Sequence, residues 1–162
     1  MKGKTVLKVI LWIMVLGSAA LIFFFSAQDS SASTDTSGRF IRALFGLFPS
    51  FRTMSEATQT ELVDSVMNLV RKCAHFCIYA FFGFWLMFLV RQYRRTRTLL
   101  VTGAASLAYA ISDEIHQYFV PGRACQLKDI CIDLAGALTG ALVALLFAVI
   151  WQILRKYRIR GR

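Results

Sequence analysis

The sequence predicts an all-α membrane protein: a bundle of four transmembrane helices with an outward amphipathic segment between the first and second spans. Three observations predict it. The chain has 162 residues and is 57% hydrophobic, above the roughly 45–50% of soluble domains. A soluble chain this short could not bury so much apolar surface inside itself. The apolar residues also gather in long uncharged runs, and the net charge of +10 comes from basic residues beside those runs.

We treat residues 1–162 as one membrane domain with spans at about 6–25, 73–90, 98–120 and 129–154. Each run approaches the roughly 17–25 residues that cross a bilayer. A cleaved signal peptide is the alternative for the first run. The Ser-Ala-Gln sequence that follows it is a poor cleavage site, which favours an uncleaved span.

The predicted outer segment, residues 26–72, has three parts. Residues 28–38 are mostly Ser, Thr and Asp and predict a loop. Residues 39–48 carry apolar side chains at helical spacing, typical of a helix lying flat in the headgroup region. Thr58 and Glu61 then have the spacing of a capping box, so we expect a helix to begin there.

Basic residues set the expected orientation. The N-terminus, the predicted loop at 91–97 and the tail at 155–162 together carry twelve Lys or Arg and no acidic residue. The positive-inside rule therefore places both termini in the cytoplasm, and the 26–72 segment and 121–128 turn outside. A basic loop beside a span is a topology signal, so we expect membrane lipids, and no nucleic acid, as partners.

Polar side chains collect at the predicted outer ends of three spans. An ionisable group in hydrocarbon costs about 2.5–3.5 kcal/mol on insertion scales, so such groups pair with one another or line a wet cavity. The set predicted to meet is Arg71, Lys72, His75 and Tyr79 before and within the second span, Asp113, Glu114, His116 and Gln117 in the third, Arg123 in the turn, and Asp129 and Asp133 in the fourth.

Three interpretations of this set remain open. The basic members suit a phosphate or another anion. The acidic and imidazole members, with His75, Asp113, Glu114 and His116 as candidates, could be general acid–base groups or metal ligands. The carboxylates could instead simply neutralise the basic residues in buried ion pairs.

Familiar metal and nucleophile motifs do not occur. The chain contains no HExxH and no GxSxG, and its four cysteines lack zinc-site spacing. We therefore predict no metal site and no cofactor. Gly136 and Gly140 form a GxxxG pair for close helix packing, either inside the monomer, which we favour, or between protomers.

Three motifs, in this order along the chain, resemble the signature of the VanZ-like family over roughly residues 20–145. The Phe25–Gln28 stretch resembles it too, whereas Ile78 stands where many members carry an acidic residue. The motifs are Arg71-Lys72-x-x-His75-Phe76-x-x-Tyr79, then Ser112-Asp113-Glu114-Ile115-His116-Gln117, then Phe119-Val120-Pro121-Gly122-Arg123 with Asp129, Asp133, Gly136 and Gly140.

The resemblance implies a small multi-pass protein of the bacterial plasma membrane. The family's namesake is associated with low-level resistance to teicoplanin, a lipid-tailed glycopeptide that acts outside the membrane. We therefore expect recognition of an anionic or lipid-linked cell-envelope molecule at the outer leaflet. A membrane enzyme acting on a lipid phosphate or envelope peptide is one alternative, and a scaffold for protein partners is another.

The recognition hypothesis gives each member of the set a role. Arg71, Lys72 and Arg123 would contact the anion, and the histidines would be the pH-sensitive members. The carboxylates of Asp113, Glu114, Asp129 and Asp133 would orient the basic side chains.

Overall fold

The computed structural model is built from helices and describes residues 2–27, 30–93, 97–121, 123 and 125–160. No strand occurs within these ranges, so the predicted all-α class is confirmed. The helices are α1 (Lys2–Ser26), α2 (Ser30–Phe45), α3 (Pro49–Arg52), α4 (Glu56–Tyr93), α5 (Thr98–Tyr118) and α6 (Leu127–Arg160).

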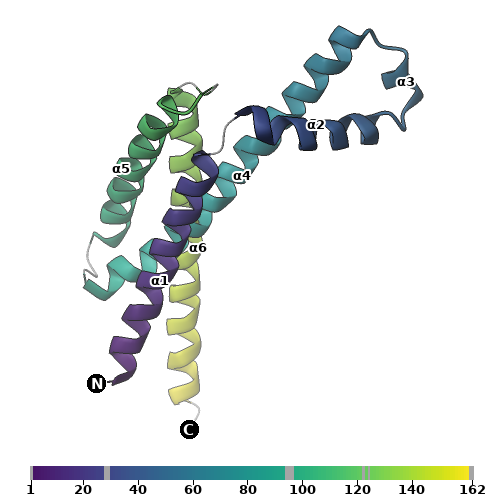
Figure 1. The fold of residues 1–162 in the computed structure, drawn as a ribbon. Helices are drawn as coiled ribbons and strands as arrows, with labels where there is room; N and C mark the ends of the chain where they lie inside the picture. Colours follow the sequence, from purple (N-terminus) through teal and green to yellow (C-terminus); the bar gives the residue numbers. More distant parts are fainter. Residues whose placement is uncertain (1, 28–29, 94–96, 122, 124, 161–162) are drawn as a thin grey trace.

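The helices form a bundle with an arm projecting from it (Figure 1). α1, α5, α6 and the second half of α4 make the bundle, and α2, α3 and the first half of α4 make the arm. Both chain ends lie at the end of the bundle far from the arm. Buried apolar residues from all four bundle helices, such as Ile22, Phe82, Ala110 and Ala137, form its core.

Three helices are long and apolar enough to cross a membrane: Gly3–Ser26, Glu56–Tyr93 and Leu127–Arg158. α5 is not among them, because Thr, Ser, Asp and Glu residues interrupt its apolar sequence. The described part of the chain therefore supports three of the four predicted spans. The third predicted span, at 98–120, stays a prediction.

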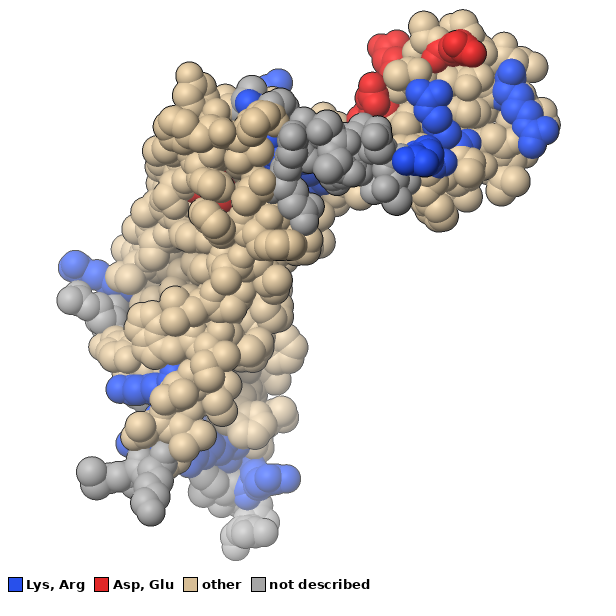
Figure 2. Space-filling model, viewed as in Figure 1, with Lys and Arg blue, Asp and Glu red and all other residues tan. Residues whose placement is uncertain are grey.

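The outer surfaces of α1 and α6 support a membrane location. Large apolar side chains on both helices are exposed, including Ile13, Phe24, Phe147 and Trp151. Figure 2 shows a broad uncharged surface on the bundle above the basic side chains near the chain ends. Contiguous apolar surface of this extent is costly in water and favourable in lipid.

The second predicted span is part of a much longer helix. We expected a helix beginning at the Thr58 capping box and a separate span at 73–90, but α4 runs unbroken from Glu56 to Tyr93. Its start is capped by Ser55, whose Oγ accepts a hydrogen bond from the Thr58 backbone N–H at 3.3 Å. At 1.5 Å per residue its 38 residues extend about 57 Å, beyond the roughly 30 Å of a hydrocarbon core.

The expected loop at 28–38 is wrong from Ser30 onward, because α2 is helical from Ser30 to Phe45; residues 28 and 29 lie outside the described residues. α2 also ends before the predicted limit of 48. Gly38 is buried, and a Cβ built on it would lie 4.0 Å from Val63 of α4. α2 thus packs on α4 at Gly38, and it is helical from Ser30 despite the weak helix propensity of its Ser- and Thr-rich first turns.

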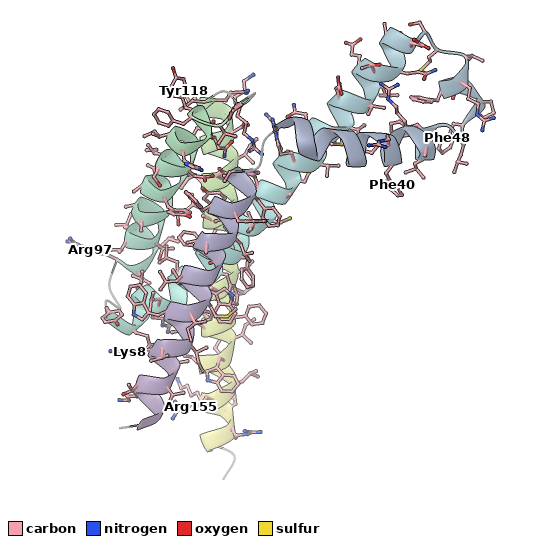
Figure 3. The ribbon with its side chains drawn as sticks, in the orientation of Figure 1. Lys8, Phe40, Phe48, Arg97, Tyr118 and Arg155 are labelled. Carbon is pink, nitrogen blue, oxygen red and sulfur yellow. The ribbon has the colours of Figure 1, made fainter. Side chains whose placement is uncertain are left out.

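The arm has a small core of its own. The rings of Phe45 and Phe51 lie 5.5 Å apart, and the Gln59 side chain donates a 3.1 Å hydrogen bond to the Phe51 carbonyl. Phe40 and Phe48 are exposed, and Figure 3 shows them projecting from the arm. Phe48 lies in the turn between α2 and α3, and the headgroup position of residues 39–48 stays a prediction.

α4 and α6 pack most extensively, through glycines on α6. A Cβ at Gly136 would collide with the Phe76 carbonyl, and one at Gly140 with the Ala80 carbonyl. The GxxxG pair is therefore used inside the monomer, as we favoured, since only glycine allows the two backbones to approach so closely.

The remaining boundaries differ modestly from the expected ones. α4 continues two residues past Arg91 into the predicted 91–97 loop, whose residues 94–96 lie outside the described residues. α6 begins at Leu127 and continues through the predicted tail to Arg160. All four cysteines are free.

Candidate functional site

Asp113 of α5 lies at the centre of a buried polar cluster. Asp113 is 4% exposed. Three side chains donate hydrogen bonds to its Oδ2 atom. Ser26 of α1 donates at 2.8 Å, Tyr79 of α4 at 3.3 Å and Gln117 of α5 at 3.1 Å. This carboxylate therefore links α1, α4 and α5.

Two acidic residues of α6 face basic residues of α4. The Lys72 Nζ atom lies 2.9 Å from Oδ1 of Asp129 in a partly exposed salt bridge. One helical turn deeper, Nδ1 of His75 lies 3.4 Å from Oδ1 of Asp133, whose side chain is 1% exposed. Because 72 and 75 lie on one face of α4 and 129 and 133 on one face of α6, the pairs form successive layers.

Arg123 closes the cluster from the turn after α5. Its Nη1 donates to the Gln117 side-chain oxygen at 3.1 Å and its Nη2 to the Phe25 carbonyl at 3.3 Å. Burial, with the nearby Arg71 guanidinium, lowers the pKa of Arg123, and nearby carboxylates led by Asp113 oppose this shift. Its buried Nε has no hydrogen-bond partner among the described residues.

Glu114 has a structural contact of its own. Its Oε1 accepts a 2.6 Å hydrogen bond from the Gln126 backbone N–H, immediately before α6 begins. The residue is 1% exposed. The contact joins the end of α5 to the start of α6 and thereby positions the acidic residues of α6.

A small pocket opens between α4 and α6. It offers about 10 Å³ of space, about the room that one water molecule needs. Arg71 lies at this pocket and donates to the Asn68 side chain at 3.0 Å. Its lining is Arg71, Lys72, His75, Gln117, Asp129, Ile132 and Asp133.

Most of the residues predicted to meet are brought together, and His116 is the exception. Its ring stacks on Phe23 of α1 with 4.3 Å between the ring centroids. It therefore faces α1 rather than the His75–Asp133 pair. Of the four acid–base candidates, His75 and Asp113 lie near the pocket, whereas Glu114 holds the start of α6.

Ser26 was not among the predicted site residues, although it makes a short contact to Asp113. Helical spacing could not reveal it, because Ser26 comes from α1 and ends that helix. The one available signal was the Phe25–Gln28 stretch that resembles the family signature.

One grouping has the geometry of a metal site. One ligand atom each from His75, Asp113 and Asp133 can be chosen so that all lie within 4.8 Å of one another. These residues come from α4, α5 and α6. The spacing of any single helix could not predict this grouping.

The fold and the site together define a class: a helical protein with three helices fit to span a membrane and a buried polar cluster at one end. A family model described as VanZ/LLP1 matches residues 9–148. The chain belongs to the VanZ/LLP1 family. Comparisons with curated proteins and with solved structures gave no match.

Proposed function

We propose that this VanZ-family protein recognises the anionic headgroup of a lipid-linked cell-envelope molecule at the outer leaflet. The observation that carries the proposal is the position of Arg71 and Arg123 at one end of the bundle. Arg71 lines the same small pocket as Gln117, and Arg123 donates a 3.1 Å hydrogen bond to the Gln117 side-chain oxygen. Like charges brought together this way favour an anion between or above them.

The hydrogen bonds of both arginines support this proposal. Arg123 donates to an amide side chain and a backbone carbonyl, and Arg71 donates to the Asn68 amide. These hydrogen bonds fix the orientation of each guanidinium. Because the acceptors are uncharged, they do not neutralise its positive charge. A phosphate or carboxylate would supply the charge-assisted acceptors that a guanidinium binds best.

Lys72 has a different part in the proposal. Its ammonium already pairs with Asp129 at 2.9 Å, so it would contribute only by exchanging that carboxylate for the ligand. The pocket beneath holds about 10 Å³, too little for a headgroup. The anion would therefore lie over the rim formed by the arginines, with lipid chains against the exposed apolar surface of the bundle.

The proposed location is the bacterial plasma membrane with both termini in the cytoplasm. Figure 3 shows Lys8 and Arg155 toward the end of the bundle that carries the termini, and Tyr118 at the opposite end with the polar cluster. If the end bearing the termini is cytoplasmic, as the positive-inside rule favours, the arginines face outward.

A lipid-binding experiment tests the proposal. The purified protein would be placed in nanodiscs with or without a long-chain polyprenyl phosphate, and bound lipid would be measured by mass spectrometry. Arg123→Ala removes a guanidinium, which we expect to weaken binding about 10- to 100-fold, since hydrogen bonds to charged groups contribute roughly 1.5–3 kcal/mol. Arg155→Ala, at the other end of the bundle, is the matched control.

Three results would change the proposal. Equal binding by wild type and Arg123→Ala would contradict it. A dephosphorylated or cleaved lipid would instead support the enzyme hypothesis. Lipid-independent capture of protein partners would support the scaffold hypothesis.

The family resemblance extends the proposal to teicoplanin resistance. In a strain made more resistant by this protein, Arg123→Ala should abolish the gain while Arg155→Ala should retain it. Immunoblots of the membrane fraction would show whether both variants reach normal amounts. An unchanged phenotype at normal amounts of Arg123→Ala would contradict the link.

A further inference from the structure

From the geometry of His75, Asp113 and Asp133 we infer a binding site for a divalent transition-metal cation inside the polar cluster. One nitrogen and two carboxylate oxygens, each from a different helix, lie within 4.8 Å of one another. Ligands about 2.0–2.2 Å from one cation are separated by roughly 3–4.4 Å. Small side-chain movements would bring these three atoms to that spacing.

Asp133 supplies an independent argument for a ligand at this place. Its side chain is 1% exposed, and both of its carboxylate oxygens lack a hydrogen-bond partner among the described residues. Burial of a carboxylate is unfavourable unless the group is paired, hydrogen-bonded or bound to a metal. The one facing imidazole, 3.4 Å away, does not satisfy both oxygens.

Hydrogen bonds from neighbouring side chains already fix the orientation of the Asp113 carboxylate, as they do for many metal-binding carboxylates. Ser26, Tyr79 and Gln117 all donate to its Oδ2. Carboxylate ligands of metals are commonly held by such hydrogen bonds, which fix the group and tune its affinity. None of these three donors carries a positive charge that would replace a cation.

The surrounding charges leave room for a cation. Lys72 is paired with Asp129, and neither Arg71 nor Arg123 donates a hydrogen bond to Asp113 or Asp133 among the described residues, although Asp113 lies near enough to Arg123 to act on its charge. The inner layer thus contains two carboxylates and one imidazole, which a divalent cation would neutralise. The pocket that His75 and Asp133 line offers about 10 Å³, which is room for a single ion or water.

The mixture of donors indicates the kind of cation. Mg²⁺ and Ca²⁺ prefer oxygen ligands, whereas imidazole suits transition metals and Zn²⁺. One imidazole with two carboxylates therefore favours Mn²⁺ or Zn²⁺ over Mg²⁺. Three protein ligands would leave coordination positions for water or for an anion at the rim.

This inference does not depend on the proposed headgroup recognition. Mn²⁺ is the probe, because it avoids the thiols of the exposed cysteines, which Zn²⁺ would also occupy. The full chain, purified in detergent and treated with a chelator, would be titrated with Mn²⁺ while the electron paramagnetic resonance signal of free Mn²⁺ is followed. We expect one Mn²⁺ per chain and at least about tenfold weaker binding of Mg²⁺ in competition.

Variants assign the ligands. Asp133→Asn and His75→Ala should each abolish stoichiometric binding, and Ser26→Ala should weaken it about 10- to 100-fold through its effect on Asp113. Asp64→Asn, which removes an exposed carboxylate in the arm, should bind as the wild type does. Arg155→Ala, at the other end of the bundle, should also retain Mn²⁺.

Wild-type protein that binds no Mn²⁺ stoichiometrically would overturn the inference. Undiminished binding by well-folded Asp133→Asn and His75→Ala would also overturn it. Circular dichroism and size-exclusion chromatography would report folding. If Asp133→Asn does not fold, His75→Ala and the more conservative His75→Gln test the same ligand set from α4.

Discussion

Ser26, the last residue of α1, donates a 2.8 Å hydrogen bond to Asp113 near the end of α5, across 87 positions of sequence. Ser26 is fully buried and Asp113 is 4% exposed. The contact joins the first span to the polar cluster. It also limits where α1 can end, because a one-residue rotation of the helix would turn the hydroxyl away by about 100°.

We expect Ser26→Ala to destabilise the protein by about 1–3 kcal/mol, because it removes a donor from a buried carboxylate. Thermal unfolding in detergent, followed by circular dichroism, would measure the change. Ser112→Ala is the control, since Ser112 is exposed and, within the described part of the chain, bonds only to the Tyr109 carbonyl in its own helix. The control should stay within about 0.5 kcal/mol of wild type; equal effects would contradict the importance of the Ser26 contact.

Tyr79→Phe should cost less than Ser26→Ala, about 1 kcal/mol, because the ring keeps its packing and only the longer 3.3 Å hydrogen bond is lost. Both hydroxyls donate to the same Asp113 oxygen. Their effects should therefore be non-additive, by about 0.5 kcal/mol or more. The four unfolding curves of a double-mutant cycle would measure this coupling, and strict additivity would show that the two donors act independently.

Close packing of α6 on α4 predicts a different kind of damage. In Gly140→Leu the new side chain would meet the Ala80 carbonyl, and the helices would have to separate. We expect a loss of about 1–3 kcal/mol or more. Gly17→Ala, where a Cβ meets nothing within 4 Å, should leave the unfolding temperature unchanged or raise it. Similar stability of both variants would contradict the packing of α6 on α4.

Sequence patterns predicted the parts of the fold that depend on local hydropathy. The uncharged runs at 9–25 and 134–154 lie within α1 and α6. His75 and Tyr79, four residues apart on α4, both reach the cluster, because a helix places every fourth residue on one side. Hydropathy and helical periodicity were sufficient to predict these features, because each depends only on the order of residues within one helix.

Other features depended on tertiary contacts and could not be predicted. The predicted boundary at residue 72 lies inside α4, which continues through Arg71 and Lys72, and Lys72 there pairs with Asp129 of α6. The helicity of the Ser-rich start of α2 runs against its local propensity. The His75–Asp113–Asp133 grouping needs the relative rotation of three helices, which no single helix encodes.

Salt should weaken headgroup binding if the arginines provide the attraction. The Debye length falls from about 10 Å at 0.1 M salt to about 3 Å at 1 M. Because Arg71 and Arg123 are only partly buried, we expect markedly weaker binding of a polyprenyl phosphate as salt rises, and little change for a neutral polyprenol. Salt-independent binding of both lipids would indicate that the apolar surface alone binds them.

The free cysteines allow the orientation to be tested. Cys125 is exposed in the turn beside the cluster, and Tyr157 is exposed near the other end of the bundle. In intact cells a membrane-impermeant maleimide should label a variant that retains only Cys125. The same reagent should label Tyr157→Cys, in a background without other cysteines, only after lysis. The reverse pattern would place the cluster in the cytoplasm.

Photocrosslinking tests the recognition of an anionic headgroup most directly. A polyprenyl phosphate with a photoreactive group next to the phosphate would be irradiated with the protein in nanodiscs, and the adducts would be mapped by mass spectrometry. We predict adducts on peptides that contain Arg71–His75 and Gln117–Arg123, lost in Arg123→Ala and retained in Arg155→Ala. Adducts spread along the lipid-facing sides of α1 and α6, and equal in both variants, would contradict the account.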